Sequence, residues 1–581
     1  MRLRILVACV LSLITIGFIT AAPSDPSGLV VHEWGTFLAM NGSDGVSLDG
    51  MYHEEHALPS FVHARSKDQL RLPMSRIKSE TPVIYFYTPQ VKRVQVEVGF
   101  PTGLWTQWYP QATTVAPGIV QAGSPPQTRN GRISWDVTVR PADLKHTEPP
   151  ATAGDALWNH ARDVDAAYVV GSNQARPGSA EEWERFIFYR GLGEVPLPIQ
   201  VRLEAGRISA STPERRGLQH LFILNVQDGR GAYSYAPALR PDHGSFESAV
   251  PSINSSLPLD RFVETISADV ESRLVASGLY RKEAQAMVNT WKSSYFKTDG
   301  VRVLFVLPQS WTDRFIPMRV TPVPEQLVRV MVGRVELLDA ERERRAEAAI
   351  RDLASPAADV RERAFALLRR EGRYVEPIVR RAVRTASDEQ VRMLGRRLLL
   401  SDFVTELRSA LTDAQTGERV NTVPVYLRSQ LASLLREVGL TAEAKQQEES
   451  ALAELSRMQP PTRHDHSSRH TFRALAWAHE GAGHDAEALE WYGRFVEFGS
   501  QVAGAGRGCA GTCHQTMGPR DPSFFRDWYA GRKYGELAVK TGQAPQLIAA
   551  HEGVLSATPR NLASPLSLAY LYEAVDLSLS R

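Results

Sequence analysis

The chain has 581 residues, more than one hydrophobic core usually organises, so several domains are expected. Hydrophobic residues at 43% and charged residues at 23% are ordinary globular values, which excludes a disordered, collagenous or coiled-coil chain. The 67 basic and 65 acidic residues give a formal charge of +2, too balanced for a protein whose main role is to bind nucleic acid. Three cysteines are too few for a disulfide-dense scaffold.

Residues 1–22 have the order of segments typical of a secretory signal peptide. A basic start with Arg2 and Arg4 precedes an apolar run, and small residues for cleavage follow it. A retained membrane anchor is the alternative, although the run is short for a span. After cleavage, Cys509 and Cys513 are the cysteines that remain. We therefore expect a periplasmic or secreted protein without a stable membrane span.

Residues 28–335 are predicted to form a β-rich, sandwich-like domain. β-branched and aromatic runs alternate there with Gly, Pro, Asn and Asp, a pattern typical of strands separated by turns. One helical insertion, residues 259–296, has apolar side chains at helical spacing on both sides of Gly278. The expected strands are 82–87, 91–98, 132–139, 167–170, 185–189, 198–203, 218–226 and 301–307.

The strand pattern stops near Asp339, where we expect a protease-sensitive junction. Residues 340–400 form an Arg-rich segment that resembles a HEAT-like helical unit. Residues 401–581 form a region that resembles tetratricopeptide (TPR) units, because the pattern at 473–492 predicts two short helices across a Gly-containing turn. A plain helical bundle is the alternative to a true repeat. The fold class is therefore α+β and multidomain, with an all-α C-terminal half.

The strongest chemical signal is the run Cys509-Ala510-Gly511-Thr512-Cys513-His514. A c-type haem is held by two cysteine thioethers, and the histidine after the second cysteine binds the iron. Two residues usually separate the cysteines, whereas three do so here, so the run resembles the rarer three-residue variant of the cytochrome c motif. This resemblance implies haem c attached to Cys509 and Cys513, with His514 as an axial ligand.

Three other interpretations of this run stay open, the simplest being an unmodified pair of cysteines. A Cys509–Cys513 disulfide is sterically possible and would close a small loop. A zinc or other metal site with Cys509, Cys513 and His514 would need a fourth ligand.

A haem iron bound by His514 also has an opposite face that a second ligand can occupy. A six-coordinate haem would favour electron transfer, whereas a five-coordinate haem would favour ligand or peroxide chemistry. A solvated polar loop is the alternative role for the nearby histidines. The candidates for the second ligand are His464, His466, His470 and Met517.

The N-terminal domain contains a second group of candidate metal ligands. Histidines with neighbouring carboxylates are ligand types of Zn, Cu and Fe sites, although the spacing differs from that of zinc proteases. A divalent metal here would support a hydrolase, and surface histidines are the alternative. The four histidines are His32, His53, His56 and His63.

Four short strings between about residues 30 and 336 resemble an uncharacterised family of exported bacterial proteins that opens with His-Glu-Trp-Gly-Thr-Phe. The strings are 32–37, 80–87, 188–193 and 331–334. The resemblance implies no activity and no catalytic residue. Phosphate-binding, dinucleotide-binding and Gly-x-Ser-x-Gly motifs are absent from the sequence, which argues against common nucleotide enzymes and hydrolases.

Two function classes follow, and whether the protein is an enzyme stays open. The first is an exported c-type haem protein for electron transfer or redox-linked binding, whose β domain binds a substrate or a protein redox partner. The second is a haem-free binding or scaffold protein whose helical repeats contact a protein partner. A metal-dependent hydrolase is a distant third.

Overall fold

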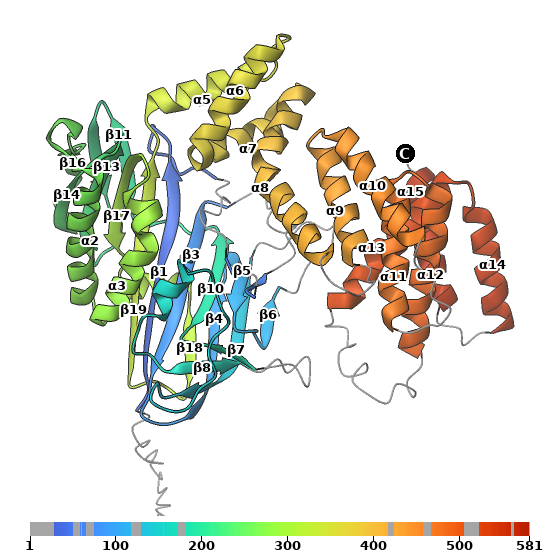
Figure 1. Ribbon diagram of the computed structural model, residues 1–581, viewed down its shortest axis with the longest axis horizontal. Helices are drawn as coiled ribbons and strands as arrows, with labels where there is room; N and C mark the ends of the chain where they lie inside the picture. Colours follow the sequence, from blue (N-terminus) through green and yellow to red (C-terminus); the bar gives the residue numbers. More distant parts are fainter. Residues whose placement is uncertain are drawn as a thin grey trace, which may run out of the picture.

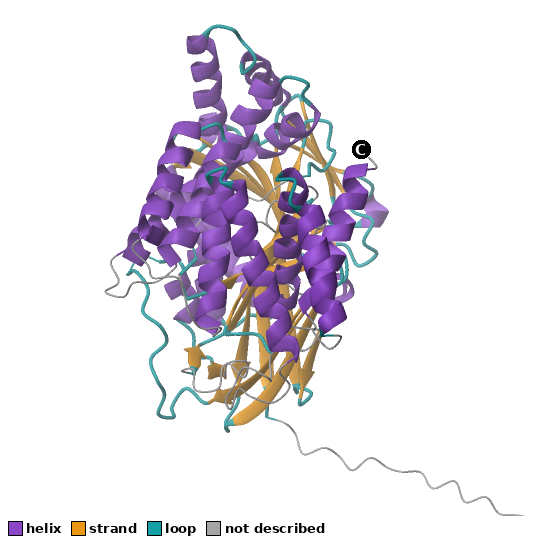
Figure 2. Ribbon diagram, turned by 90° about the vertical axis from the view of Figure 1, so that its right-hand side faces the viewer, coloured by secondary structure: helices purple, strands orange, loops and turns teal. Residues whose placement is uncertain are grey.

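The computed structural model describes residues 28–49, 58–59, 61–64, 75–117, 129–154, 156–171, 181–415, 423–456, 466–504, 522–558 and 563–579. The protein is α+β, with β-sheets in the N-terminal half and helices in the C-terminal half, as predicted (Figure 1). Viewed from the helical half, the strands lie behind the helices (Figure 2). In the described part of the chain, no helix has both the length and the apolar character needed to cross a bilayer.

A ten-stranded sheet forms the centre of the N-terminal half. Its two longest strands, β1 and β19, pair in parallel at the middle, although one begins this half and the other ends it. The N-terminal half is therefore closed into one unit. The strand order is β16 (Leu257–Pro258), β14 (Arg230–Leu239), β13 (Leu218–Gln227), β17 (Gly300–Val306), β19 (Gln326–Leu337), β1 (Val30–Asn41), β3 (Ile77–Tyr87), β10 (Ile187–Gly193), β5 (Gly103–Tyr109) and β2 (His63–Ala64).

Smaller sheets cover one face of this central sheet. Val96 and Trp135 of the six-stranded sheet share a core with Phe37 and Tyr189 of the central sheet, so the two sheets pack face to face. The six-stranded sheet contains β18 (Met318–Thr321), β4 (Lys92–Phe100), β7 (Gly131–Arg140), β8 (Tyr168–Gly171) and β9 (Glu182–Glu184), with β6 (Thr114–Ala116) beside β7. A three-stranded sheet contains β11 (Gln200–Glu204), β12 (Arg207–Ser211) and β15 (Phe246–Ala249).

Helices cover the opposite face of the central sheet. The predicted insertion at 259–296 is present as α2 (Leu259–Ala276), α3 (Arg281–Trp291) and the π-helical turn η4 (Lys292–Phe296). Gly278, with φ +114°, lies at the break between α2 and α3. The remaining short helices of this half are α1 (Trp158–Arg162), α4 (Gln309–Phe315), η2 (Pro241–His243) and η3 (Ile253–Ser255).

The C-terminal half is helical throughout its described residues. The predicted division at 400/401 falls inside α8, which continues without a break because no Gly or Pro interrupts residues 396–415. The helices are α5 (Ala340–Asp352), α6 (Ala358–Glu371), η5 (Gly372–Tyr374), α7 (Glu376–Thr385), α8 (Glu389–Gln415), α9 (Val423–Glu437), α10 (Thr441–Ser456), α11 (His466–Gly481), α12 (Asp485–Gly504), α13 (Pro522–Lys540), α14 (Ala544–Ala557) and α15 (Ala563–Leu579).

Three helix pairs of this half have the same kind of turn. α9–α10, α11–α12 and α13–α14 are each joined through a glycine with positive φ: Gly439 at +76°, Gly483 at +77° and Gly542 at +73°. The first two turns also share the sequence Gly-x-x-Ala-Glu-Ala. A glycine tolerates this left-handed conformation, so the chain can end one helix and reverse direction within a few residues.

The junction near Asp339, which the sequence predicts to be protease-sensitive, is flanked by packed residues. Leu38 and Met40 of β1 and Leu338 share a hydrophobic core with α5–α8. The Asp339 side chain accepts a hydrogen bond of 2.8 Å from the backbone N–H of Arg342 and so caps α5. The first helices of the C-terminal half therefore pack on the sheet rather than follow a loose linker.

Candidate functional site

The residues of the predicted haem site lie mostly outside the described residues. His466 and His470 lie in the first turns of α11, one helical turn apart and thus on one face of that helix. The other predicted residues are outside the described residues: Cys509, Cys513, His514, Met517 and His464. The described helices that flank this segment can nevertheless be placed relative to one another.

Helices α12 and α13 run antiparallel, side by side. Lys540 Nζ, at the end of α13, lies 2.8 Å from Asp485 Oδ2, at the start of α12. Nearer the middle of both helices, the Tyr534 ring lies against Gly493. Continuing this register brings the last residue of α12, Gly504, level with the first residue of α13, Pro522. Packed helix axes are about 8–10 Å apart, so Gly504 and Pro522, which flank residues 505–521 in the sequence, lie close together.

The start of α11 lies at the same end of these helices. The ring centroids of Phe472 in α11 and Trp491 in α12 are 5.9 Å apart, and the Tyr492 hydroxyl hydrogen-bonds the Glu480 carboxylate. In this antiparallel pair, His466 is level with about residue 497. Gly504 is then roughly 10 Å further along the axis, at 1.5 Å per residue. His466 and His470 are therefore near the two points where the segment 505–521 begins and ends.

The second predicted site is only partly described. His32 Nδ1 lies 2.8 Å from Glu283 Oε2, and both side chains are fully buried. The Tyr87 hydroxyl donates a hydrogen bond of 2.7 Å to the other oxygen of Glu283. His63 Nε2 instead lies 2.9 Å from Glu182 Oε1.

These two histidines do not lie at one site. His32 is on β1 and His63 is on β2, four strand spacings away, which is roughly 19 Å. His53 and His56 are outside the described residues. Within the described ranges, no three or more His, Cys, Asp or Glu side chains are grouped in a way that could hold a metal ion. The predicted four-histidine site is thus not assembled by the two members that can be placed.

A cavity of about 330 Å³, which the sequence analysis did not predict, lies on the helix-covered face of the central sheet. Its walls are largely aromatic, and Glu80, Arg190, Thr290 and Ser294 contribute polar groups. Ligand-binding pockets commonly have volumes of about 300–1,000 Å³, so a cavity at the lower end of this range suits a molecule of one or two rings. The aromatic residues are Trp34, Phe61, Trp158, Phe186, Phe188, Trp291 and Tyr295.

Hydrogen bonds and stacking fix the orientation of the aromatic walls. The Trp158 indole N–H donates a hydrogen bond of 2.8 Å to Glu184 Oε2, and Arg162 Nη2 donates a hydrogen bond of 2.7 Å to the same oxygen. The rings of Trp291 and Tyr295 are stacked, with centroids 4.7 Å apart and planes 11° apart. Protein groups beside the cavity therefore hold these rings in place, so the walls are preorganised before a ligand binds.

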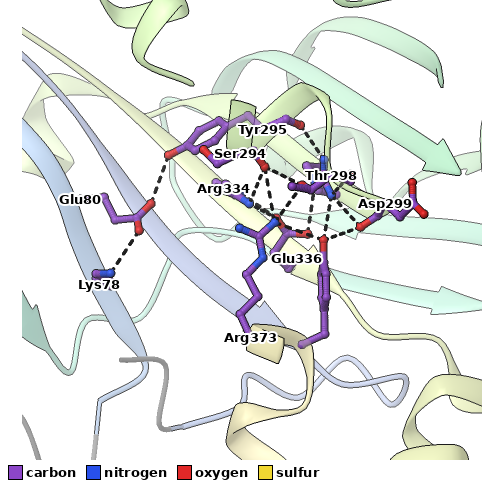
Figure 3. A network of polar contacts seen from close by, with 11 residues as sticks. Lys78, Glu80, Ser294, Tyr295, Thr298, Asp299, Arg334, Glu336 and Arg373 are labelled. Atoms are coloured by element: carbon purple, nitrogen blue, oxygen red, sulfur yellow. Dashed lines mark hydrogen bonds and ion pairs between the residues drawn. The ribbon is translucent and has the colours of Figure 1, made fainter. Parts of the chain in front are cut away.

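The carboxylate at the polar end of the cavity is already paired. Lys78 Nζ lies 3.4 Å from Glu80 Oε1, and the Tyr295 hydroxyl donates 3.4 Å to Glu80 Oε2 (Figure 3). Burial raises the pKa of the Tyr295 phenol, and the Glu80 charge raises it further. Tyr295 therefore remains a protonated donor at neutral pH.

Behind Tyr295, a buried charge network joins the two halves of the protein (Figure 3). Glu336 Oε1 accepts hydrogen bonds from Arg334 Nε at 2.7 Å and from Arg373 Nη2 at 3.3 Å. Glu336 Oε2 accepts a hydrogen bond of 3.2 Å from Arg302 Nε. Arg373 comes from the helical half. Burial acts to raise the pKa of Glu336, but Arg302 and Arg334 outweigh burial and hold that pKa below its ordinary value.

Three of the four strings that carry the family resemblance contribute to the cavity. Trp34 lies in 32–37, Glu80 in 80–87, and Phe188 and Arg190 in 188–193. Comparison with protein-family models and with curated proteins finds no match for this chain.

Proposed function

We propose that the protein is an exported c-type haem protein, with haem c attached through Cys509 and Cys513 and with His514 as an axial ligand of the iron. The observation that carries this proposal is the register of α12 and α13, which brings the two ends of the segment 505–521 together. A haem-bearing segment that starts and ends at one point can present its cofactor against the ends of the adjoining helices.

The donor set and its surroundings fit this group. Two thiols and an adjoining imidazole are the ligands of haem c. The helices on either side of the segment pack through a buried apolar cluster that includes Phe472, Phe495 and Val496. When bound, haem c supplies one-electron redox chemistry.

The chain's own residues set the coordination of the iron. His514 binds one face of the haem, and we propose that a histidine at the start of α11 binds the other. Support comes from the position of His466 and His470 near the ends of the segment. His464 and Met517 are the other candidates. Two axial ligands from the protein favour electron transfer over ligand chemistry.

Export and partners belong to the same proposal. The signal peptide at 1–22 would deliver the chain to the periplasm, where a protein redox partner would be met. We also propose that α9–α14 form TPR-like repeats, supported by three helix pairs with the same glycine turn, and that α5–α8 form a HEAT-like segment. The sandwich-like β unit would then bind a substrate or a partner.

A haem-free scaffold is the second candidate function. The recurring glycine turns favour it, since repeats of helix pairs commonly provide extended surfaces for protein partners. In this case, Cys509 and Cys513 would form a disulfide, and no cofactor would be present.

The visible absorption spectrum distinguishes the two candidates. The protein should be purified from a host that exports it and matures three-residue-spaced haem motifs. The haem proposal expects a Soret band that survives acid–acetone extraction, because thioethers do not dissociate. A Cys509→Ser/Cys513→Ser double variant should lose covalent haem. Colourless wild-type protein from such a host would favour the scaffold.

A further inference from the structure

We propose that the cavity between the central sheet and helices α1 and α3 binds a small aromatic carboxylate. This inference does not depend on the haem, because all the residues that line the cavity lie in the N-terminal half. It rests on the shape and chemistry of the cavity walls, on one arginine and on the charge of the buried groups nearby.

The walls select a planar, apolar body. Trp34 and Phe188 line the cavity from the sheet, whereas Trp158 and Trp291 line it from the helices. A flat ring placed between them would contact aromatic faces or edges on both sides, which contributes beyond the burial of area alone. The indole N–H of Trp291 is buried without a hydrogen-bond partner in the described part of the protein.

The polar end of the cavity favours a ligand with an acidic group. Arg190 lines the cavity, and its guanidinium carbon lies 5.8 Å from the centre of the Phe188 ring, at the boundary between the polar and aromatic parts. A guanidinium has five N–H donors in a fork that matches a carboxylate. A ligand ring over Phe188 would therefore bring its carboxylate within reach of Arg190.

The surrounding charges point the same way. On this face of the sheet and at the adjoining turn, the described buried charged groups include five basic side chains and four carboxylates. In a medium of low dielectric, the guanidinium of Arg190, which lines the cavity itself, favours an anion over a cation. Glu80 does not offset this preference, since Lys78 is its ion-pair partner. The groups are Lys78, Arg190, Arg302, Arg334 and Arg373 with Glu80, Glu184, Glu283 and Glu336.

Three probes of one shape test the charge preference. 2-Naphthoate, 2-naphthamide and 2-naphthylmethylammonium should be titrated into the mature protein by isothermal calorimetry. We expect 2-naphthoate to bind at one site per chain, with an affinity about tenfold or more higher than that of the other two probes. This difference corresponds to the contribution of one charge-assisted hydrogen bond. Equal affinities, a preference for the amine, or no binding would overturn the proposal.

Three variants test the location. Arg190→Lys keeps the charge but loses the fork, so it should weaken 2-naphthoate about tenfold while 2-naphthamide changes little. Arg185→Lys is the matched control, because Arg185 lies on the same segment but over the Tyr168 ring, and it should bind as wild type. Ala156→Phe fills the cavity from its loop side and should abolish binding of every probe.

The variants must be shown to be folded by circular dichroism before they are titrated. If Arg190→Lys does not fold, the ranking of the three probes on wild type and their loss in Ala156→Phe decide the matter. Undiminished 2-naphthoate binding in Ala156→Phe would place the ligand elsewhere and overturn the proposal.

Discussion

Lys540 Nζ lies 2.8 Å from Asp485 Oδ2, which joins the last residue of α13 to the first residue of α12. Both side chains are near the surface, so this ion pair contributes little to stability. It does show the register of the two helices. That register brings Gly504 level with Pro522 and gives the Cys-x-x-x-Cys-His segment two neighbouring ends.

The position of α11 leads to a prediction about the iron's second ligand. His464, His466 and His470 should each be replaced by Ala in a separate variant. In one of these three variants, the six-coordinate haem spectrum should become five-coordinate. The physical reason is the loss of the axial imidazole opposite His514. Absorption spectra of the reduced and oxidised protein measure the change.

His479 provides the matched control. It lies on the same helix α11 but near the Gly483 turn, at the opposite end, where its ring centroid is 5.7 Å from that of His484. A His479→Ala variant should keep the wild-type spectrum. A spectral change in His479→Ala, with none in the other three variants, would contradict the proposed position of the haem.

The charge network predicts a large cost for removing its acid. Glu336→Gln leaves Arg302, Arg334 and Arg373 buried without their shared carboxylate and should lower the free energy of unfolding by about 3–5 kcal/mol. Glu341→Gln is the control, because Glu341 is 71% exposed in its pair with Arg345 and should cost less than about 1 kcal/mol. Urea unfolding measures both. Equal effects would show that the network does not stabilise the fold.

The same carboxyl predicts a pH dependence. Because the folded-state pKa of Glu336 is below its ordinary value, its contribution to stability is present above the unfolded pKa of about 4.3 and is lost as pH falls through the folded pKa. Protonated Glu336 resembles glutamine. The difference in unfolding free energy between wild type and Glu336→Gln should therefore be largest near neutral pH and shrink below about pH 4. A difference that stays constant down to pH 3 would contradict this.

Two exposed glycines predict opposite effects of the same substitution. A Cβ at Gly483 or at Gly553 would meet no atom within 4 Å, but only Gly483 has a positive φ, +77°. Gly483→Ala should destabilise the helical half by about 1 kcal/mol, because alanine is strained there. Gly553→Ala, inside α14, should stabilise it by about 0.5–1 kcal/mol. Thermal melts followed by circular dichroism distinguish them, and the same sign for both would refute the argument.

The fold was predictable where side-chain patterns are simple. Alternating burial along β4 and the apolar spacing along α2 both follow from the sequence. The strands β1 and β19 were missed as strands because their interiors contain charged residues. Glu33 and Arg329, one from each strand, are a fully buried pair with a distance of 2.6 Å, so their charges do not mark a surface. A single sequence does not show which charges will be paired across 296 positions.

The cavity could not be predicted for a related reason. Its walls come from separate segments, and Trp34, Trp158 and Trp291 meet only after the helices have packed on the sheet. The family-like strings at 32–37, 80–87 and 188–193 were the available signal, but they carried no chemical role. The packing of Leu38 and Met40, at the end of a strand, against helices of the C-terminal half could not be read from the sequence either.

The intact mass of the denatured mature chain tests the central proposal most directly. Protein from a host that matures three-residue-spaced haem motifs should begin within a few residues of Ala22 and be heavier than the polypeptide by one haem. Cys509→Ser/Cys513→Ser should have the mass of its polypeptide alone. A wild-type chain without haem, and lighter than its reduced form by the hydrogen atoms of two thiols, would contradict the haem proposal and establish the Cys509–Cys513 disulfide.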